Sequence, residues 1–233
     1  MNEIVKLYEE QQAEWEEFRL RVLQLDTVEL KEIPMGNFSV FAQFNPARAV
    51  SSNAKLDAKS IANRKCFLCQ QNRPDIQRGI ALNERFEALV NPFPILKGHL
   101  TIVNREHRNQ EILPVISDFI DFTKAMPHFT LFYNGPSCGA SAPDHMHFQA
   151  GSRGFMPIEH DWKERKGEKV VQQGSATLWR MDDAPRNALV IESTCIDDAG
   201  RLFNAVYRNL PTSAAGDEPM MNLLAMYEEG RWI

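Results

Sequence analysis

The spacing of apolar residues changes several times along the chain, and each change predicts a different kind of element. Over about residues 1–30, apolar side chains recur every three or four positions with five glutamates between them. This spacing predicts an N-terminal amphipathic helix with an acidic solvent face. The same period returns in residues 111–126 and again from about Asp198, so two further helices are expected there.

Short apolar runs bounded by glycine, proline or asparagine predict strands. They lie at 38–44, 86–94, 99–104, 129–134, 145–150, 170–173, 176–181 and 188–193. The middle of the chain therefore follows the order strand, strand, helix, strand, loop, strand. This order favours an α+β fold with a mostly antiparallel sheet and helices packed on one face.

Residues 221–233 predict a hairpin: a strand, a Glu-Glu-Gly turn and a returning strand of only three residues that contains Trp232. A large apolar side chain at that place requires a cover. We therefore expect either that residues 1–233 are the N-terminal part of a longer two-half protein, or that a second subunit, as in a homodimer, covers this edge.

Composition narrows the class of protein. The 233 residues are 43% hydrophobic and 24% charged, which is ordinary for a globular chain and suits a single domain. A net charge of −5 without long basic runs argues against a nucleic-acid-binding protein. No apolar run has the length of a membrane span, and four cysteines are too few for a disulfide scaffold. The sequence therefore predicts a cytoplasmic protein.

The predicted strand at 145–150 contains the first group of residues with evident chemistry. Alternate residues of a strand share a face, which places His145, His147 and Gln149 in one row. Met146 and Phe148 would face the core. Two imidazoles and an amide are costly to bury without partners, so the row indicates a functional site. A solvent-facing polar row is the alternative.

A loop of small residues, 135–144, leads directly into this row. Its backbone N–H groups can approach an anion closely, and the hydroxyls of Ser137 and Ser141 add further donors. Many such loops are only connections. Beside a histidine row, however, the loop predicts a phosphate-binding site, because a neutral imidazole can attack phosphorus.

Cys66 and Cys69 have the spacing of a thiolate pair that could supply two of the four ligands of a Zn²⁺ ion. The other two would come from histidines, with His107 and His145 as the first candidates and His99 and His160 as competitors. A redox pair and chance spacing remain alternatives for the two cysteines.

Taken together, these motifs resemble the transferase branch of the histidine-triad superfamily, between about Phe44 and Gln149. This branch includes galactose-1-phosphate uridylyltransferase, diadenosine tetraphosphate phosphorylase and plant GDP-galactose phosphorylase. The landmarks are CFLC (66–69), NPFPILKGHLTIVNREH (91–107), YNGPSCGASAPD (133–144) and HMHFQ (145–149). The resemblance implies a histidine-triad-like nucleotidyltransferase domain that acts in carbohydrate metabolism.

The resemblance also implies roles for individual residues. His147 would be the nucleophile, and Gln149 would hydrogen-bond the phosphate at the position where hydrolytic relatives carry a third histidine. The residues implied for phosphate contact are Asn134, Gly139 and Ser141, and those implied for a structural Zn²⁺ are Cys66, Cys69, His107 and His145.

The expected reaction transfers a nucleoside monophosphate from a nucleoside diphosphate sugar or a dinucleoside polyphosphate to a phosphate acceptor. A nucleotidyl-histidine would be the covalent intermediate. The loop is one residue longer than in the uridylyltransferases, and HMHFQ is more similar to the phosphorylases. The alternatives are a nucleotide hydrolase of the histidine-triad type and a non-catalytic, zinc-stabilised nucleotide-binding module.

Overall fold

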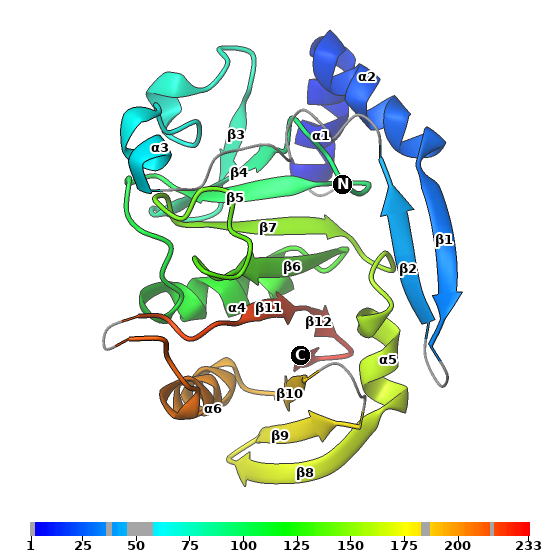
Figure 1. Ribbon diagram of the computed structural model, residues 1–233, viewed down its shortest axis with the longest axis vertical. Helices are drawn as coiled ribbons and strands as arrows, with labels where there is room; N and C mark the ends of the chain where they lie inside the picture. Colours follow the sequence, from blue (N-terminus) through cyan, green and yellow to red (C-terminus); the bar gives the residue numbers. More distant parts are fainter. Residues whose placement is uncertain (1–2, 36–38, 46–57, 183–186, 215–216) are drawn as a thin grey trace.

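The computed structural model describes residues 3–35, 39–45, 58–182, 187–214 and 217–233. Among them, six strands form a sheet with the order β11-β6-β7-β5-β4-β3, in which all neighbours are antiparallel (Figure 1). The strands are β3 (Gly79–Ala81), β4 (Phe86–Val90), β5 (Leu100–Asn104), β6 (Phe129–Asn134), β7 (His147–Ser152) and β11 (Asn222–Ala225). The predicted antiparallel sheet is confirmed.

Helices cover one face of this sheet and enclose the main core. The core joins side chains of the sheet to those of α1 (Glu3–Glu14), α2 (Glu16–Gln24), α4 (Ile116–Ala125) and α6 (Ile196–Asn209). Phe148 of β7 lies at its centre, with ring centroids 5.1 Å from Phe86 and 4.9 Å from Phe119. The fold is therefore α+β with helices packed on one face, as the apolar spacing predicted.

The opposite face of the sheet carries the polar residues of β7. His147 pairs with Val103 and Gln149 pairs with Thr101, so these four residues share that face. A small apolar cluster on the same face consists of Cys66, Leu68, Leu89, Val103 and Ala142. It holds the CFLC segment and the loop before β7 against the sheet.

The remaining elements lie around this sheet (Figure 1). A three-stranded sheet contains β8 (Lys166–Gln173), β9 (Ala176–Met181) and β10 (Leu189–Glu192), and a two-stranded sheet contains β1 (Glu29–Pro34) and β2 (Ser39–Phe44). The short elements are α3 (Ala58–Asn63), α5 (Ile158–Glu164), β12 (Tyr227–Glu228), β13 (Arg231–Trp232), η1 (Leu25–Thr27), η3 (Gln70–Asn72) and η4 (Leu113–Val115). No helix in the described part of the chain combines the length and apolar character that crossing a membrane requires.

The prediction of one helix over about residues 1–30 is wrong in its continuity. Trp15 has extended backbone angles, with φ −104° and ψ 94°, and separates α1 from α2. The Trp15 ring packs on Phe18, at 5.9 Å between centroids, and both side chains are buried. The last residues of the predicted helix belong instead to η1 and β1.

The strand predicted at 145–150 begins two residues later, at His147. The N–H of His145 instead closes a turn by donating to the carbonyl of Ala142 at 3.1 Å. His145 therefore precedes the strand. Met146 and Phe148 are buried in the core, as predicted.

The predicted C-terminal hairpin is present in part: its first strand is divided into β11, which pairs with β6, and β12, whose Tyr227 pairs with Trp232 of β13. Trp232 also exchanges two backbone hydrogen bonds with Ser193, at 2.8 and 3.0 Å. Its side chain is half-buried and packs on Tyr227, with 4.9 Å between ring centroids. Part of the cover that this tryptophan requires thus comes from the chain itself.

Candidate active site

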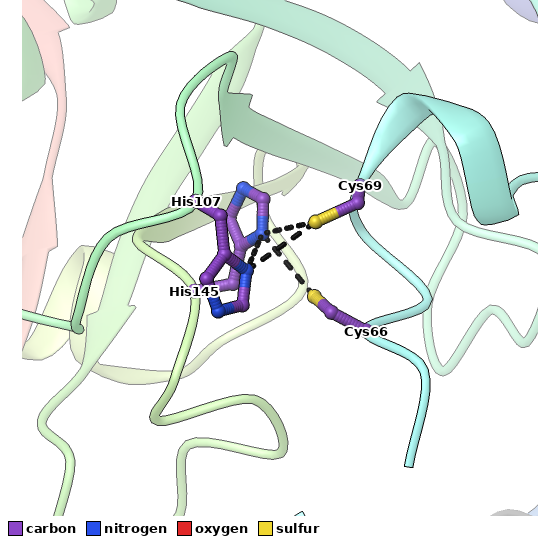
Figure 2. Close-up of side chains that lie close together, drawn as sticks. All are labelled: Cys66, Cys69, His107 and His145. Carbon is purple, nitrogen blue, oxygen red and sulfur yellow. Dashed lines mark hydrogen bonds between the residues drawn. The ribbon is translucent and has the colours of Figure 1, made fainter. Parts of the chain in front are cut away.

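Four side chains from distant parts of the sequence converge at the start of β7 (Figure 2). The ligand atoms of Cys66, Cys69, His107 and His145 all lie within 4.8 Å of one another. Cys66 Sγ is 3.2 Å from His145 Nδ1, and Cys69 Sγ is 3.3 Å from His107 Nδ1. The two Nδ1 atoms are 3.2 Å apart. The structure therefore brings together the four predicted metal ligands.

His145 is oriented for this cluster by its second ring nitrogen. Its Nε2–H donates to the carbonyl of Asn104 at 2.8 Å, and this leaves Nδ1 with the lone pair that faces the thiols. Burial lowers the pKa of His145, which favours the neutral ring. A histidine that binds a metal through one nitrogen commonly donates from the other in this way.

The CFLC segment is held rigidly at the cluster. Asn72 donates to the carbonyl of Cys66 at 2.8 Å, and Arg73 Nε donates to the carbonyl of Leu68 at 2.7 Å. The guanidinium of Arg73 also forms an ion pair of 2.6 Å with Glu87. These contacts fix the positions of both thiols relative to the sheet.

A second ion pair joins this segment to the loop before β7. Arg64 Nη2 lies 2.6 Å from Asp144 Oδ1, and the same guanidinium donates to the carbonyl of Ser141 at 3.4 Å. The side chains of Arg64 and Asp144 are only 21% and 17% exposed. The cysteine side and the histidine side of the cluster are thus tied directly to one another.

Two thiols and two imidazoles are the donor set of structural zinc sites. Burial raises the pKa of the Cys69 thiol, and the neighbouring Cys66 raises it further. A divalent cation among these ligands would favour both thiolates and offset that cost. The four residues fit a metal ion such as zinc. Within the described residues, His99 and His160 lie outside this group.

His147, the second histidine of the row, is buried, with 3% of its surface exposed. Its Nδ1–H donates to the carbonyl of His145 at 2.8 Å, so Nε2 carries the lone pair. Burial lowers the pKa of His147 to about 4. At neutral pH the ring is therefore an uncharged base with a fixed tautomer.

The backbone of His147 is held by a residue that sequence reasoning missed. Gln110 is 1% exposed and accepts the N–H of His147 at 2.8 Å. Its Nε2 donates to the carbonyls of His147, at 2.9 Å, and Asn134, at 3.1 Å. The pairing of β6 with β7 ends at Phe132 and Gln149, and Gln110 bonds to both strands just beyond that point. No motif in the sequence marks this role.

Gln149 occupies the next position on the same face of β7. Its Oε1 lies 2.9 Å from Nε2 of His99, a residue 50 positions earlier in the chain. The predicted row is thus present for His147 and Gln149, whereas His145 turns into the cysteine cluster.

The three residues predicted to contact phosphate lie along the connection from β6 to β7. Asn134 ends β6, and its Nδ2 donates to the carbonyl of Gly139 at 3.5 Å. Gly139 has φ +94°, which disfavours any side chain there. Gly139 and Ser141 are exposed, and Asn134 is half-buried. The role of these three residues in phosphate binding stays a prediction.

Comparison with known proteins gives the family. The family model "Domain of unknown function (DUF4922)" matches residues 7–152, which include the sheet strands β3 to β7, the cysteine cluster and the histidine row. The chain belongs to the DUF4922 family. A search of curated proteins finds no match to this DUF4922 protein.

Solved structures with a similar fold include yeast Ap4A phosphorylase Apa2, with a TM-score of 0.51 and 13% identity over 93% of this chain and 78% of that chain. A DUF4931 family protein (BCE0241) from Bacillus cereus ATCC 10987 gives a TM-score of 0.49 and 17% identity over 66% of this chain and 82% of that chain. The similarity to Apa2 shows that the DUF4922 protein has the histidine-triad-like α+β fold that the sequence predicted.

Proposed function

We propose that this chain is a nucleotidyltransferase that forms a covalent nucleotidyl intermediate on His147. The observation that carries the proposal is the hydrogen bond of 2.8 Å from Nδ1–H of His147 to the carbonyl of His145. This bond leaves Nε2 unprotonated, as a nucleophile must be. The depressed pKa of the buried ring keeps it in that form.

The reaction proceeds in two displacements at one phosphorus. Nε2 attacks the α-phosphorus of the nucleotide, an N–P bond forms, and the P–O bond to the leaving phosphate chain breaks. An oxygen of inorganic phosphate then attacks the same phosphorus, the N–P bond breaks, and the ring regains its lone pair. Each step exchanges one bond for another without a net change in oxidation state.

The neighbouring residues suit transfer rather than hydrolysis. Gln149 lies on the same face as His147, and an amide neither protonates a leaving group nor activates water. Its N–H donors, with Asn134, the backbone of Gly139 and the hydroxyl of Ser141, would stabilise charge on the phosphate oxygens.

A dinucleoside polyphosphate is the proposed substrate class, ahead of a nucleoside diphosphate sugar. The name of the fold relative, Ap4A phosphorylase, supports this choice, as does the similarity of HMHFQ to the phosphorylases. With Ap4A and phosphate, attack at the α-phosphorus would release ATP first and ADP second.

The proposed metal ion is a structural Zn²⁺ held by Cys66, Cys69, His107 and His145. Four protein ligands leave no open position for substrate. Held in this way, the ion would fix the start of β7 and, with it, the carbonyl of His145 that sets the tautomer of His147.

The single-domain organisation, the longer two-half parent and the homodimer stay predictions.

Product analysis tests the proposed function. The whole zinc-loaded chain is incubated with Ap4A in the presence and absence of inorganic phosphate, and in parallel with a set of nucleoside diphosphate sugars. We expect ATP and ADP in a phosphate-dependent reaction, and no product with His147→Ala. Release of AMP independent of phosphate would identify a hydrolase instead. No turnover of any of these compounds would refute the enzyme assignment.

A further inference from the structure

His99 is a buried histidine that neither the metal cluster nor the nucleophile uses. It immediately precedes β5, is 1% exposed, and its ring stacks on Phe132 at 6.0 Å with an angle of 22° between the planes. Phe132 is the residue of β6 that pairs with Gln149. A polar ring buried this deeply is costly unless its nitrogens form hydrogen bonds within the protein.

Two hydrogen bonds to other described residues fix the tautomer of the His99 ring. The backbone N–H of Ile95 donates to His99 Nδ1 at 3.2 Å, so Nδ1 carries a lone pair and the ring proton lies on Nε2. Nε2–H therefore donates to Gln149 Oε1, at 2.9 Å. A carboxamide whose oxygen is held on one side presents its NH₂ group on the other.

We propose that His99 is a positioning residue that fixes the carboxamide of Gln149 with its N–H donors toward the substrate phosphate. The inference rests on the proposed function and deepens it, because it explains how this site presents donors to the anion. Without the bond from His99, the amide could rotate by half a turn. It would then present an oxygen lone pair to a negatively charged phosphate, which is repulsive.

Two substitutions of His99 separate this role from a merely structural one. In glutamine, the terminal nitrogen overlaps the position of Nε2, so H99Q keeps the donor to Gln149 and loses the acceptor for Ile95. In asparagine, the side-chain oxygen overlaps the position of Nδ1, so H99N keeps the bond to Ile95 and loses the one to Gln149. The pair thus removes one hydrogen bond at a time.

The test is the single-turnover rate at which the zinc-loaded chain becomes nucleotidylated by Ap4A, with melting temperature and zinc content measured alongside. We expect H99N to slow labelling by about 100-fold, because losing one donor to the developing charge costs about that much. H99Q keeps the donor and should slow labelling by less than about threefold. In a Gln149→Ala background, H99N should cause no further loss, because its effect passes through Gln149.

Three outcomes would overturn the inference. They are slower labelling by H99Q than by H99N, a folded H99Q that is not labelled, and an undiminished effect of H99N in the Gln149→Ala background. If H99N does not fold, the labelling rate of H99Q alone decides whether the inference stands. A wild-type chain that is never labelled refutes the proposed function itself, and this result is distinct from labelling whose rate fails to respond to His99.

Discussion

Replacing Gln110 by methionine should destabilise the protein and impair the site at the same time. Methionine has nearly the length of glutamine but makes no hydrogen bonds of comparable strength. The substitution therefore leaves three backbone groups without the partner they have now, namely the N–H and C=O of His147 and the C=O of Asn134.

The magnitude follows from the burial of these groups. Gln110 is 1% exposed and His147 is 3% exposed, so water cannot readily replace the lost bonds. A buried backbone group left unpaired costs about 1–3 kcal/mol, and a second acceptor lone pair reduces the cost for a carbonyl. We expect the free energy of unfolding to fall by about 2–4 kcal/mol in Gln110→Met.

Equilibrium unfolding in urea of the zinc-loaded protein measures this difference. The matched control is Gln173→Met on the exposed strand β8, which should change stability by less than about 0.5 kcal/mol. Gln110→Glu keeps one oxygen as acceptor for the N–H of His147 but places the other oxygen against two carbonyls. It should lose at least as much stability as Gln110→Met. A loss of unfolding free energy below about 0.5 kcal/mol for Gln110→Met would refute the reasoning, because the three hydrogen bonds of Gln110 would then contribute nothing net.

Three further perturbations test other parts of the account. Cys66→Ser should reduce bound zinc and lower the melting temperature to that of chelator-treated wild type, whereas equal zinc content in variant and wild type would contradict the metal site. Gly151→Ala should lower the free energy of unfolding by about 1–3 kcal/mol, because a Cβ there would lie 1.9 Å from Leu96 Cδ1. The control is Gly200→Ala, whose Cβ would meet nothing within 4 Å and which should be neutral or stabilising. Equal urea midpoints for the two variants would contradict this prediction. Burial raises the pKa of Glu218 above its usual 4.5, so the folded protein binds this proton more tightly and stability should fall as pH rises from about 4.5 through the folded-state pKa. Glu218→Gln should remove that decline in urea midpoints, and parallel curves for variant and wild type would contradict it.

Much of the fold can be predicted from the spacing of apolar residues along the chain. The strand at 129–134 has the predicted bounds, because a short apolar run there lies between Pro127 and Gly135. The N-terminal helix was predicted as continuous because its apolar period passes through position 15 unbroken. Residues 13–17 contain no glycine or proline that would mark a break, so the extended backbone of Trp15 is seen only in the structure.

The candidate site likewise contains residues that the sequence predicted and residues that it did not. The spacing of Cys66 and Cys69 marked them as a possible ligand pair, but only the resemblance to the histidine-triad transferases favoured His107 and His145 over His99 and His160. The roles of Gln110 and His99 could not be predicted from the sequence. Gln110 bonds to His147, 37 positions further along the chain, and His99 bonds to Gln149, 50 positions further along. A single glutamine or histidine carries no signal of so distant a partner.

The most direct test of the account is the intact mass of the protein after brief reaction with Ap4A in the absence of inorganic phosphate. The reaction is quenched in denaturant at alkaline pH, because a phosphoramidate is labile in acid. The account predicts a mass increase of one adenylyl group per chain, located on the peptide that contains His147, and its complete loss when phosphate is added before quenching. It also predicts no adduct in His147→Ala. An adduct of equal yield in His147→Ala, or turnover of Ap4A without any adduct on His147, would contradict the central claim that this imidazole carries the transferred nucleotide.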